Sequence, residues 1–385
     1  MGKRLIVIGA GPMGLYAAFL AARRNLDVTV LERDRIGASL LGWGPTRLFS
    51  PLSMNAPAAV LEALPGLPSE DALLTGPEMV ERVLLPLSRH PLLYDRVKTG
   101  RRVLAMGRAG MRRLDFAGHP VRQEKPFRIL VEDDVGERIL EADLVFDSGG
   151  SALPCAAGAG GMPAVGERAA EGRILRSLGS LEAFLADAPE GRVLLIGHGH
   201  SAARAIVLLS GAARSQGNLQ VTWAFRSRHR RPIPETAGDP LPARAADVAA
   251  ANDLAAAPPP GLEVRRGVSL SALERVTGNR LRAAFTAGPS LEVDTVAAFT
   301  GYRPDLSYLG ELALDLSPVS EGTRRLHAVL AGASDCLSVP APQGADLDSG
   351  EPGFFLIGAK SFGRSNAFLL RDGIRHVELI LDRLA

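Results

Sequence analysis

The stretch of residues 4–14 constrains the fold of this chain more than any other part of its sequence. It is an apolar run that ends in Gly-Ala-Gly-Pro-Met-Gly, and a second apolar run, residues 27–31, is followed at once by Glu32. This order predicts a buried strand, a glycine turn, a helix over residues 13–24 and a second strand. The alternative interpretation is an ordinary tight turn between a strand and a helix, with no ligand.

Each glycine of this first fingerprint has its own physical role in binding a dinucleotide. Gly9 permits a tight turn, Gly11 lets the backbone approach a pyrophosphate, and Gly14 lets the helix pack close to the strand. Free N–H groups at the helix start would hold the phosphates, and Glu32 would accept from ribose hydroxyls, which favours FAD or NAD over NADP. The residues expected to contact this nucleotide are Gly9, Gly11, Pro12, Met13, Gly14, Glu32 and Arg33.

A second glycine fingerprint lies at residues 192–202, where an apolar run ends in Gly-His-Gly-His-Ser-Ala. We expect a helix to follow it, and then a strand over residues 221–225. No acid closes this strand; Arg226 and Arg228 stand there instead, as a ribose 2′-phosphate requires, so the second site is expected to take NADPH. The alternatives for these arginines are a solvated basic face or a nucleic-acid patch. The loop residues expected to contact this nucleotide are Gly197, Gly199, His200, Ser201 and Ala202.

The two fingerprints predict an α/β fold with two Rossmann-like dinucleotide-binding domains, of which the first is discontinuous. The Pro- and Ala-rich stretch 232–261 is interpreted as a mobile flap or linker with a short helix around residues 245–255. The expected domains are residues 1–168 and 311–385 for FAD, and residues 169–310 for NAD(P)H.

Further elements follow from apolar periodicity and from glycine at the ends of apolar runs. Gly149, Gly301 and Gly358 each follow a candidate buried strand, and Val103 lies in another candidate strand, so all four join the expected nucleotide contacts. The expected elements are a helix over 76–90, strands over 97–104, 127–132, 138–140, 144–147, 264–268, 281–286, 295–300 and 354–357, and a final helix over 366–384 with Ser365 or Asn366 as N-cap.

The composition excludes several functional classes. With 44 Lys and Arg against 42 Asp and Glu, the net charge of +2 is too small to favour a nucleic acid or a membrane surface as partner. Cys155 and Cys336 are the only cysteines, which excludes a C-x-x-C redox dithiol and a cysteine-rich zinc site. His198 and His200 have no carboxylate beside them, so we expect no metal. Without about 18 uninterrupted apolar residues anywhere, we expect a cytoplasmic protein with no transmembrane helix.

A larger pattern emerges when the segment Phe-Thr-Gly-Tyr-Arg-Pro-Asp at residues 299–305 and the glycine before the final helix are added to the two fingerprints. The whole chain then resembles the two-dinucleotide-domain flavoproteins, and among them most of all the flavin-containing monooxygenase branch. This resemblance implies FAD and NADPH as cofactors. It also implies that molecular oxygen is used to oxygenate nitrogen or sulfur of a small molecule, through an oxygen adduct at flavin C4a.

A shorter match concerns Asn55. Residues 52–57, Leu-Ser-Met-Asn-Ala-Pro, resemble the L-x-x-N-x-P stretch of these monooxygenases, which implies that Asn55 hydrogen-bonds to the oxygen adduct or to NADPH. Its alternative role is that of a turn or cap residue. The chain departs from the family in two places. No histidine occurs between His119 and His198, which argues against Baeyer–Villiger activity. Ala359 stands where the family has an acidic residue.

Several cations would act on the flavin. A loop that contains Trp43 and Arg47 is expected to face it, with Arg47 binding the pyrophosphate or an anionic substrate. Lys360 and Arg364, together with the start of the final helix, would stabilise an anionic reduced flavin. The alternative is that Lys360 and Arg364 are surface residues beside a packing helix. The catalytic candidates are therefore Asn55, Arg47 and Lys360.

Two other functions remain as hypotheses. The chain could be an NAD(P)H:acceptor reductase that passes electrons from FAD to a quinone, a ferredoxin or a metal species. In a different class, it could be a flavin-binding redox sensor, although the second fingerprint with its two arginines argues against this. A homodimer is the default expectation for the assembly.

Overall fold

The computed structural model describes residues 2–151, 153–331 and 340–384, so that Cys336 lies outside the described residues. The chain forms two compact units. Their boundaries at 153/154 and 301/302 differ from the expected 168/169 and 310/311, and a short segment after Leu41 also belongs to the second unit. Unit 1 contains Met1–Leu41, Ser50–Leu153 and Tyr302–Ala385, and unit 2 contains Gly42–Phe49 and Pro154–Gly301.

Unit 1 is built on a five-stranded parallel sheet whose strand order places β7 and β2 on either side of β1. The chain therefore leaves β1 toward one side and returns on the other side of it, which makes the β1–β7 crevice a topological switch point. The strands, in spatial order, are β18 (Phe354–Leu356), β7 (Leu144–Asp147), β1 (Arg4–Ile8), β2 (Asp27–Leu31) and β3 (Val97–Lys98).

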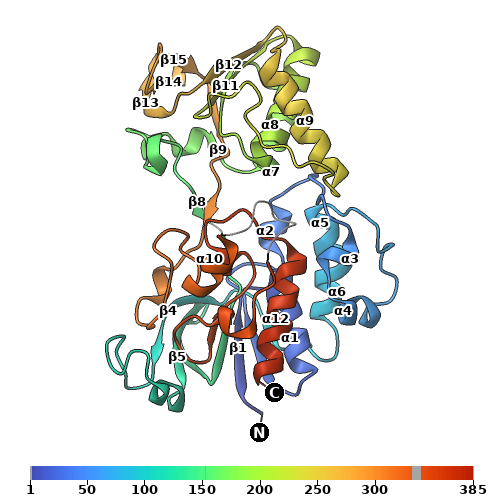
Figure 1. Cartoon of the computed structure of the whole chain (residues 1–385), viewed down its shortest axis with the longest axis vertical. Helices are drawn as coiled ribbons and strands as arrows, with labels where there is room; N and C mark the ends of the chain where they lie inside the picture. Colours follow the sequence, from blue (N-terminus) through green and yellow to red (C-terminus); the bar gives the residue numbers. More distant parts are fainter. Residues whose placement is uncertain (1, 152, 332–339, 385) are drawn as a thin grey trace. The chain divides into compact units, whose positions relative to one another are not determined.

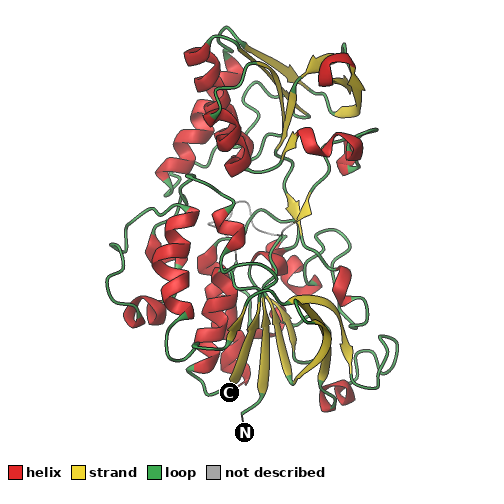
Figure 2. Cartoon of the chain, turned by 180° about the vertical axis from the view of Figure 1, so that it is seen from behind, coloured by secondary structure: helices red, strands yellow, loops and turns green. Residues whose placement is uncertain are grey.

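Alternate side chains of these strands enter two different cores, because successive residues of a strand point to opposite faces of the sheet. Leu5 and Val7 of β1 pack with the helices, whereas Ile6 and Ile8 pack with an antiparallel sheet on the other face. Figure 2 shows the longer helices of unit 1 on one side of its yellow strands. The antiparallel strands are β4 (Arg102–Arg108), β5 (Phe127–Asp133) and β6 (Gly136–Ala142).

The first helix on the helical face of unit 1 is α1 (Pro12–Ala22), and its residues from Met13 to Ala21 are all buried. The carboxyl-terminal helix α12 (Leu370–Leu384) runs beside α1 (Figure 1). The remaining helices of the unit are α2 (Ala38–Leu41), α3 (Leu52–Asn55), α4 (Ala58–Ala63), α5 (Gly76–Met79), the π-helical turn η1 (Val80–Leu84), α6 (Leu85–Ser88), α10 (Arg324–Leu330) and α11 (Ala359–Phe362), with 3₁₀ turns η2 (Pro120–Glu124), η6 (Ser307–Leu309) and η7 (Gly344–Leu347).

Unit 2 repeats this plan. Val193 and Leu195 of its central strand pack with helices, and Leu194 and Ile196 pack with an antiparallel sheet. The parallel strands, in order, are β12 (Leu262–Arg266), β11 (Leu219–Phe225), β10 (Gly191–Ile196), β16 (Thr295–Ala298) and β9 (Ile174–Leu175). The other elements are β13 (Leu270–Val276), β14 (Arg280–Phe285), β15 (Leu291–Val293), α7 (Leu178–Ala186), α8 (His200–Gln216), α9 (Pro242–Ala256), η3 (Ala159–Gly161), η4 (Arg168–Arg173) and η5 (Thr277–Asn279); β8 (Leu153–Pro154) pairs with β17 (Tyr302–Arg303) at the unit boundary.

The stretch 232–261, interpreted as a mobile flap or linker with a short helix around residues 245–255, contains that helix in a longer form, α9. Helix α9 occupies about half of this stretch, packs on α8 and buries Val248, Ala251 and Ala255. Pro242 opens the helix at a position where no backbone donor is needed, and the alanines that follow favour helix over loop. The side-chain amide of Asn252 bonds twice to the backbone of Ile233: its Oδ1 accepts the Ile233 N–H, and its Nδ2 donates to the Ile233 carbonyl. These two bonds fix the segment before the helix.

Two further expectations needed correction. The expected strand 97–104 is two strands, β3 and β4, in different sheets, because the chain turns between them at Gly100, where φ is +65°. The final helix begins at Leu370 rather than at residue 366, so neither Ser365 nor Asn366 is its N-cap. The expected helix 76–90 is present over Gly76–Ser88, but it loosens to a π turn before Pro86, which lacks the backbone N–H that an α-helix uses.

Candidate functional site

The first glycine loop has the geometry that its predicted roles require. Gly9 has a φ of +94° and donates its N–H to the carbonyl of Leu31 at 2.7 Å. A Cβ at Gly14 would clash with the carbonyl oxygen of Gly9, so the helix packs against the turn only because this position is glycine. A Cβ at Gly11 would meet no atom within 4 Å. The loop therefore leaves open space at the start of α1, where unpaired backbone N–H groups favour an anion.

Glu32 holds this loop from the neighbouring strand. One of its carboxylate oxygens accepts the backbone N–H of Ala10 at 2.7 Å, and the other accepts the N–H of Asp34 at 2.9 Å. Gly358, expected to contact a nucleotide, has a φ of +66°, and a Cβ there would lie 2.8 Å from Cγ of Met13. Met13 and Gly358 therefore lie against each other beside the first glycine loop.

The turn after β7 is joined directly to this loop. The hydroxyl of Ser148 donates to the carbonyl of Ile8 at 2.6 Å and also lies 3.2 Å from the carbonyl oxygen of Gly9. Gly149, another expected contact, donates its N–H to the carboxylate of Asp147 at 3.0 Å. The carboxyl ends of β1 and β7 thus form one hydrogen-bonded edge at the switch point, where open α/β sheets bind their ligands.

A buried charge cluster lies beneath this edge. The Lys360 ammonium is 2.7 Å from Oδ2 of Asp147 and 2.5 Å from Oη of Tyr308, and the Tyr308 hydroxyl is within 3.0 Å of both oxygens of that carboxylate. Asp147 is 0% exposed and Lys360 is 1% exposed, so the alternative that Lys360 is a surface residue was wrong. Burial, and then the negative charge of Asp147, raise the pKa of Tyr308 well above its ordinary value, so the phenol stays neutral.

Sequence reasoning named Lys360 but missed Asp147 and Tyr308. A signal for Asp147 was present, since it is an acid inside an otherwise apolar buried run that ends in Ser-Gly-Gly. Tyr308 follows no comparable pattern, and only the fold brings its 3₁₀ turn η6 to the end of β7.

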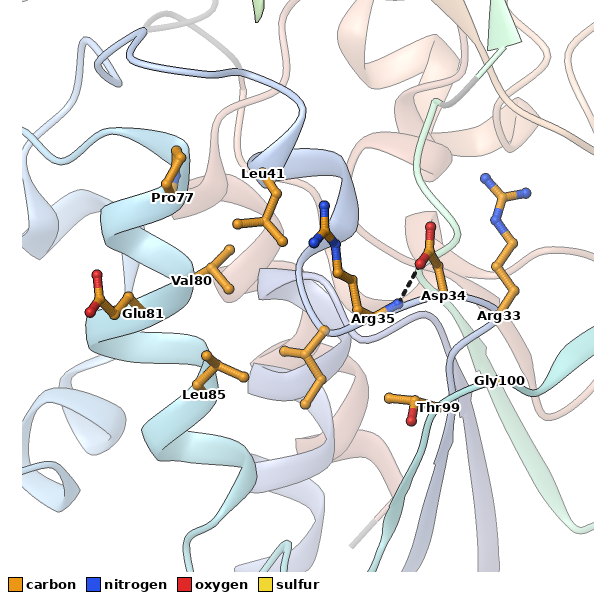
Figure 3. Close-up of a pocket in the computed structure, with 11 residues that line it drawn as sticks. Arg33, Asp34, Arg35, Leu41, Pro77, Val80, Glu81, Leu85, Thr99 and Gly100 are labelled. Carbon is orange, nitrogen blue, oxygen red and sulfur yellow. Dashed lines mark hydrogen bonds between the residues drawn. The ribbon is translucent and has the colours of Figure 1, made fainter.

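An open groove of about 800 Å³ lies at the carboxyl ends of β2 and β3. In Figure 3, Pro77, Val80 and Leu85 form one wall, and Leu41 faces them from the segment that follows β2. Arginine, aspartate and threonine side chains form the opposite rim. The groove therefore combines an apolar wall with a polar rim. Its polar lining residues are Arg33, Asp34, Arg35, Glu81 and Thr99.

Asn55 is buried and already bonded on both sides of its amide. Its Oδ1 accepts from the Ser50 hydroxyl at 2.8 Å, and its Nδ2 donates to the Ser50 carbonyl at 2.8 Å. These two bonds close the chain around the short helix α3. In this structure the side chain of Asn55 makes the hydrogen bonds expected of the alternative, a turn residue.

Trp43 and Arg47 belong to unit 2, whereas the first glycine loop belongs to unit 1. Their segment packs on α7: the Thr46 hydroxyl donates to Glu182 at 3.2 Å, and a Cβ at Gly179 would clash with the backbone there. Burial raises the pKa of the Glu182 carboxyl. Both Trp43 and Arg47 are exposed.

The second glycine loop has the same construction as the first. Gly197 has a φ of +123°, and a Cβ there would clash with the carbonyl oxygen of Phe299, whereas a Cβ at Gly199 would meet nothing within 4 Å. His200 and Ser201 begin α8, and the fully buried Ala202 takes the third position of the fingerprint. The open space again lies at a helix start, which suits an anion.

Basic residues follow β11 beside this loop. Arg226 and Arg228 are exposed, and neither makes an ion pair with another described side chain. By contrast, Arg231 is paired with Glu235 and Asp253. Burial and the charge of Arg226 lower the pKa of His198, so its imidazole is neutral at pH 7. Two unpaired guanidinium groups thus remain where the second strand ends.

Three other candidate contacts have different surroundings. Val103 lies in β4 of the antiparallel sheet, opposite Val131. Gly301, with a φ of +92°, accepts the N–H of Cys155 at the end of unit 2. Arg364 forms an ion pair of 2.9 Å with Glu321, so its charge is already matched.

Two other features are absent from the part of the chain that the structure describes. There, no group of three or more His, Cys, Asp or Glu side chains is arranged to hold a metal ion. None of the helices within the described ranges has the length and apolar character needed to cross a bilayer.

Comparison with known sequences gives partial matches. Residues 4–135 match the family described as FAD dependent oxidoreductase. The ferredoxin–NADP reductase of Lactococcus lactis subsp. cremoris is 34% identical over 85 residues, and that of Streptococcus pyogenes serotype M3 is 33% identical over 107 residues. These alignments cover 22% and 25% of this chain, and 22% and 28% of the relatives' own lengths.

Solved structures match over the whole chain. Bacillithiol disulfide reductase Bdr from Bacillus cereus has a TM-score of 0.70 at 18% identity, covering 100% of this chain and 99% of that one. Ornithine N-hydroxylase KtzI from Kutzneria sp. 744 has a TM-score of 0.64, and thioredoxin reductase from T. acidophilum one of 0.61, each at 16% identity with both chains fully covered. The predicted class of two Rossmann-like dinucleotide-binding domains is confirmed by these matches. The match of residues 4–135 to the FAD dependent oxidoreductase family supports a flavin-dependent oxidoreductase.

Proposed function

We propose that this chain binds FAD at the glycine loop of unit 1 and NADPH at that of unit 2, and that it transfers hydride from NADPH to the flavin. The observation that carries this proposal is the pair of open positions at Gly11 and Gly199, each at the start of a helix. The strand that follows each loop ends differently: Glu32 suits an unphosphorylated ribose, whereas Arg226 and Arg228 suit a 2′-phosphate.

The residues present fit these two cofactors. Backbone N–H groups at the start of α1 would hold the FAD pyrophosphate, Glu32 the ribose, and the groove lined by Arg33 and Thr99 the adenine end. FAD, when bound, supplies a carrier that accepts two electrons from a nicotinamide and passes them to a second substrate. The chain's own contribution is to bind and orient the two nucleotides.

For the second substrate, we propose that the enzyme is a monooxygenase that oxygenates nitrogen or sulfur of a small molecule. Support comes from the resemblance of residues 52–57 to the monooxygenase motif and from a fold that is shared with an ornithine N-hydroxylase. The absence of a C-x-x-C pair in the sequence is consistent with a flavin that does not deliver its electrons to a protein dithiol.

A second candidate is an NADPH:acceptor reductase, which one specific observation favours. Asn55, the residue proposed for oxygen chemistry, has its amide committed to Ser50. The partial relatives of the chain are ferredoxin–NADP reductases, which also supports electron transfer to a quinone, ferredoxin or metal acceptor.

The test begins with the purified protein and added FAD. We expect a yellow protein whose flavin absorbance bleaches without oxygen when NADPH is added, and bleaches more slowly with NADH. A protein that takes up no FAD would overturn the proposal. If FAD binds but NADPH does not bleach it, the flavin-binding redox sensor is the better explanation.

The two acceptor classes separate in the next step. The reduced protein is mixed with oxygen and a panel of amines and thioethers, and products are analysed by mass spectrometry while hydrogen peroxide is measured. A product heavier by one oxygen atom, with little peroxide, supports the monooxygenase. Rapid reduction of a quinone or ferredoxin, with no oxygenated product, supports the reductase.

A further inference from the structure

The cluster of Asp147, Lys360 and Tyr308 contains a buried ion pair. Such a pair contributes little to the stability of a folded protein. When two opposite charges are removed from water, the cost of desolvating them offsets much of their Coulomb attraction. Asp147 is 0% exposed and Lys360 is 1% exposed, so their ion pair is weak evidence for a stabilising role. Three partners nevertheless satisfy one another here at 2.5–3.0 Å. The arrangement is therefore well defined, and its location is informative.

The cluster lies at the nucleotide-binding edge of the sheet. Asp147 pairs in register with Ile8, the residue before the first glycine of the loop. A Cβ at Gly149 would lie 3.1 Å from Oδ1 of Asp147, 3.1 Å from Oη of Tyr308 and 3.5 Å from Nζ of Lys360. The turn after β7 thus rests directly on the three groups, and Ser148 of that turn is bonded to the glycine loop.

The Tyr308 hydroxyl lies among charged side chains. Asp305 and Arg33 are close enough to act on the Tyr308 hydroxyl, with opposite signs, and the phenol is neutral. Tyr308 donates to the Asp147 carboxylate and accepts from the Lys360 ammonium, which also lies 4.3 Å from the centre of the tyrosine ring. The cluster therefore presents one fixed anion and one fixed cation beneath the crevice.

We propose that Lys360 and Asp147 are positioning residues for the bound flavin, which hold the Ser148–Gly150 turn and set the reduction potential of the flavin by their opposed charges. This inference rests on the proposed binding of FAD in unit 1. Reduction adds electrons to the flavin, so a nearby cation favours the reduced form and a nearby anion disfavours it. The two side chains consequently act on the potential with opposite signs.

The experiment compares Lys360→Met, Asp147→Asn and the double variant with the wild-type protein loaded with FAD. Midpoint potentials are measured by equilibration with a reference dye, and FAD affinity by flavin fluorescence. We expect a more negative potential for Lys360→Met, a more positive one for Asp147→Asn, and a potential close to wild type for the double variant. Each single variant should bind FAD about fivefold more weakly, because the cluster on which the turn rests loses at least one of its internal hydrogen bonds. Lys360→Arg keeps the positive charge, so its midpoint potential should lie closer to that of the wild-type protein than the potential of Lys360→Met does.

A matched control exists at the other end of the same strand. Asp143 comes directly before β7 and pairs with Arg4 at 3.0 Å, so that Asp143 and Asp147 bracket the strand. Asp143→Asn and Arg4→Met make the same charge changes about 13 Å away and should leave the potential unchanged.

Three outcomes would overturn the inference. They are shifts of the two single variants in the same direction, no shift in either, or an equal shift in the controls. Failure of the wild-type protein to bind FAD would instead refute the proposed function.

Discussion

Trp223 donates its indole N–H to the backbone carbonyl of Gly197 at 2.8 Å. The tryptophan lies on β11, is fully buried, and meets Phe225 edge to face at a centroid distance of 4.9 Å. Its side chain is thus fixed by packing, and its polar atom holds the first glycine of the second loop. The loop conformation is therefore set from the neighbouring strand as well as by the glycine itself.

Trp223→Phe removes this donor while it keeps an aromatic ring in the core. We expect the free energy of unfolding to fall by about 1–3 kcal/mol, because a buried hydrogen bond is lost and some volume is left unfilled. We also expect NADPH to bind more weakly, while FAD affinity is unchanged. Urea unfolding and nucleotide titration measure the two effects. Trp43→Phe, at an exposed position, is the control, and unchanged NADPH affinity in Trp223→Phe would contradict the role of this bond.

The two glycine loops allow the two cofactors to be tested separately. Gly11 and Gly199 have extended backbone angles that any residue adopts, with φ of −76° and −93°, and a Cβ at either position meets nothing. Gly11→Ala should therefore fold normally and lose FAD affinity by tenfold or more, since the methyl group occupies the space for the pyrophosphate. Gly199→Ala should retain FAD and raise the KM for NADPH. The measurements are the flavin content of the purified protein and steady-state kinetics.

Gly14→Ala serves as the contrasting variant. Its methyl group would clash with the Gly9 carbonyl, so this variant should lower the melting temperature even without cofactor. If Gly11→Ala were as unstable as Gly14→Ala, the open space at Gly11 would not be a ligand cradle.

These loops were predictable from the sequence because their physics is local. A glycine turn, a helix start and the residue at the end of the next strand lie within about 30 residues, and each has a steric reason that spacing alone reveals. The βαβ units, their order and the differing strand ends at Glu32 and Arg226 followed from that pattern, and the fold class is confirmed.

The charge cluster was not predictable, because its members come from distant parts of the chain. Asp147, Tyr308 and Lys360 meet only after β7, η6 and α11 have packed, and a sequence pattern gives no sign of that meeting. For α9 only the start was placed too late: a helix was expected around residues 245–255, and it begins at Pro242, because proline is favourable at a helix start. The position of Trp43 in unit 2 likewise depends on a contact with α7, about 135 residues later.

Arg226 and Arg228 should determine the preference for NADPH. Both guanidinium groups are exposed and lack ion-pair partners among the described side chains, so they remain available to a 2′-phosphate. Replacing both by alanine should lower kcat/KM for NADPH by about 10- to 100-fold, because charge-assisted hydrogen bonds of about 1.5–3 kcal/mol are lost. The value for NADH, which has no 2′-phosphate, should change little. Arg231→Ala, which removes an arginine already paired with Glu235 and Asp253, is the matched control. Equal losses with NADPH and NADH would refute the assignment.

His376 should make unit 1 less stable in mild acid. Its imidazole is 2% exposed, lies stacked 5.6 Å from the ring of Phe362, and has no hydrogen-bond partner for Nδ1 among the described residues. Burial, and to a smaller extent the charge of Arg375, lower the pKa of His376 to about 4, below its ordinary value of 6.5. Between these two pH values the unfolded chain binds a proton that the folded chain does not, so stability falls as the pH falls through this window.

The expected loss from this one group is about 2 kcal/mol between pH 7 and pH 5. His376→Phe should remove that contribution while it keeps the stack on Phe362, so the difference in unfolding free energy between the two pH values should shrink by the same amount. Urea unfolding at both pH values, followed by circular dichroism, measures it, and other titrating groups cancel because they are common to both proteins. The exposed His229→Gln is the control and should retain the wild-type difference. If His376→Phe retained it too, the buried imidazole would not be the source of acid sensitivity.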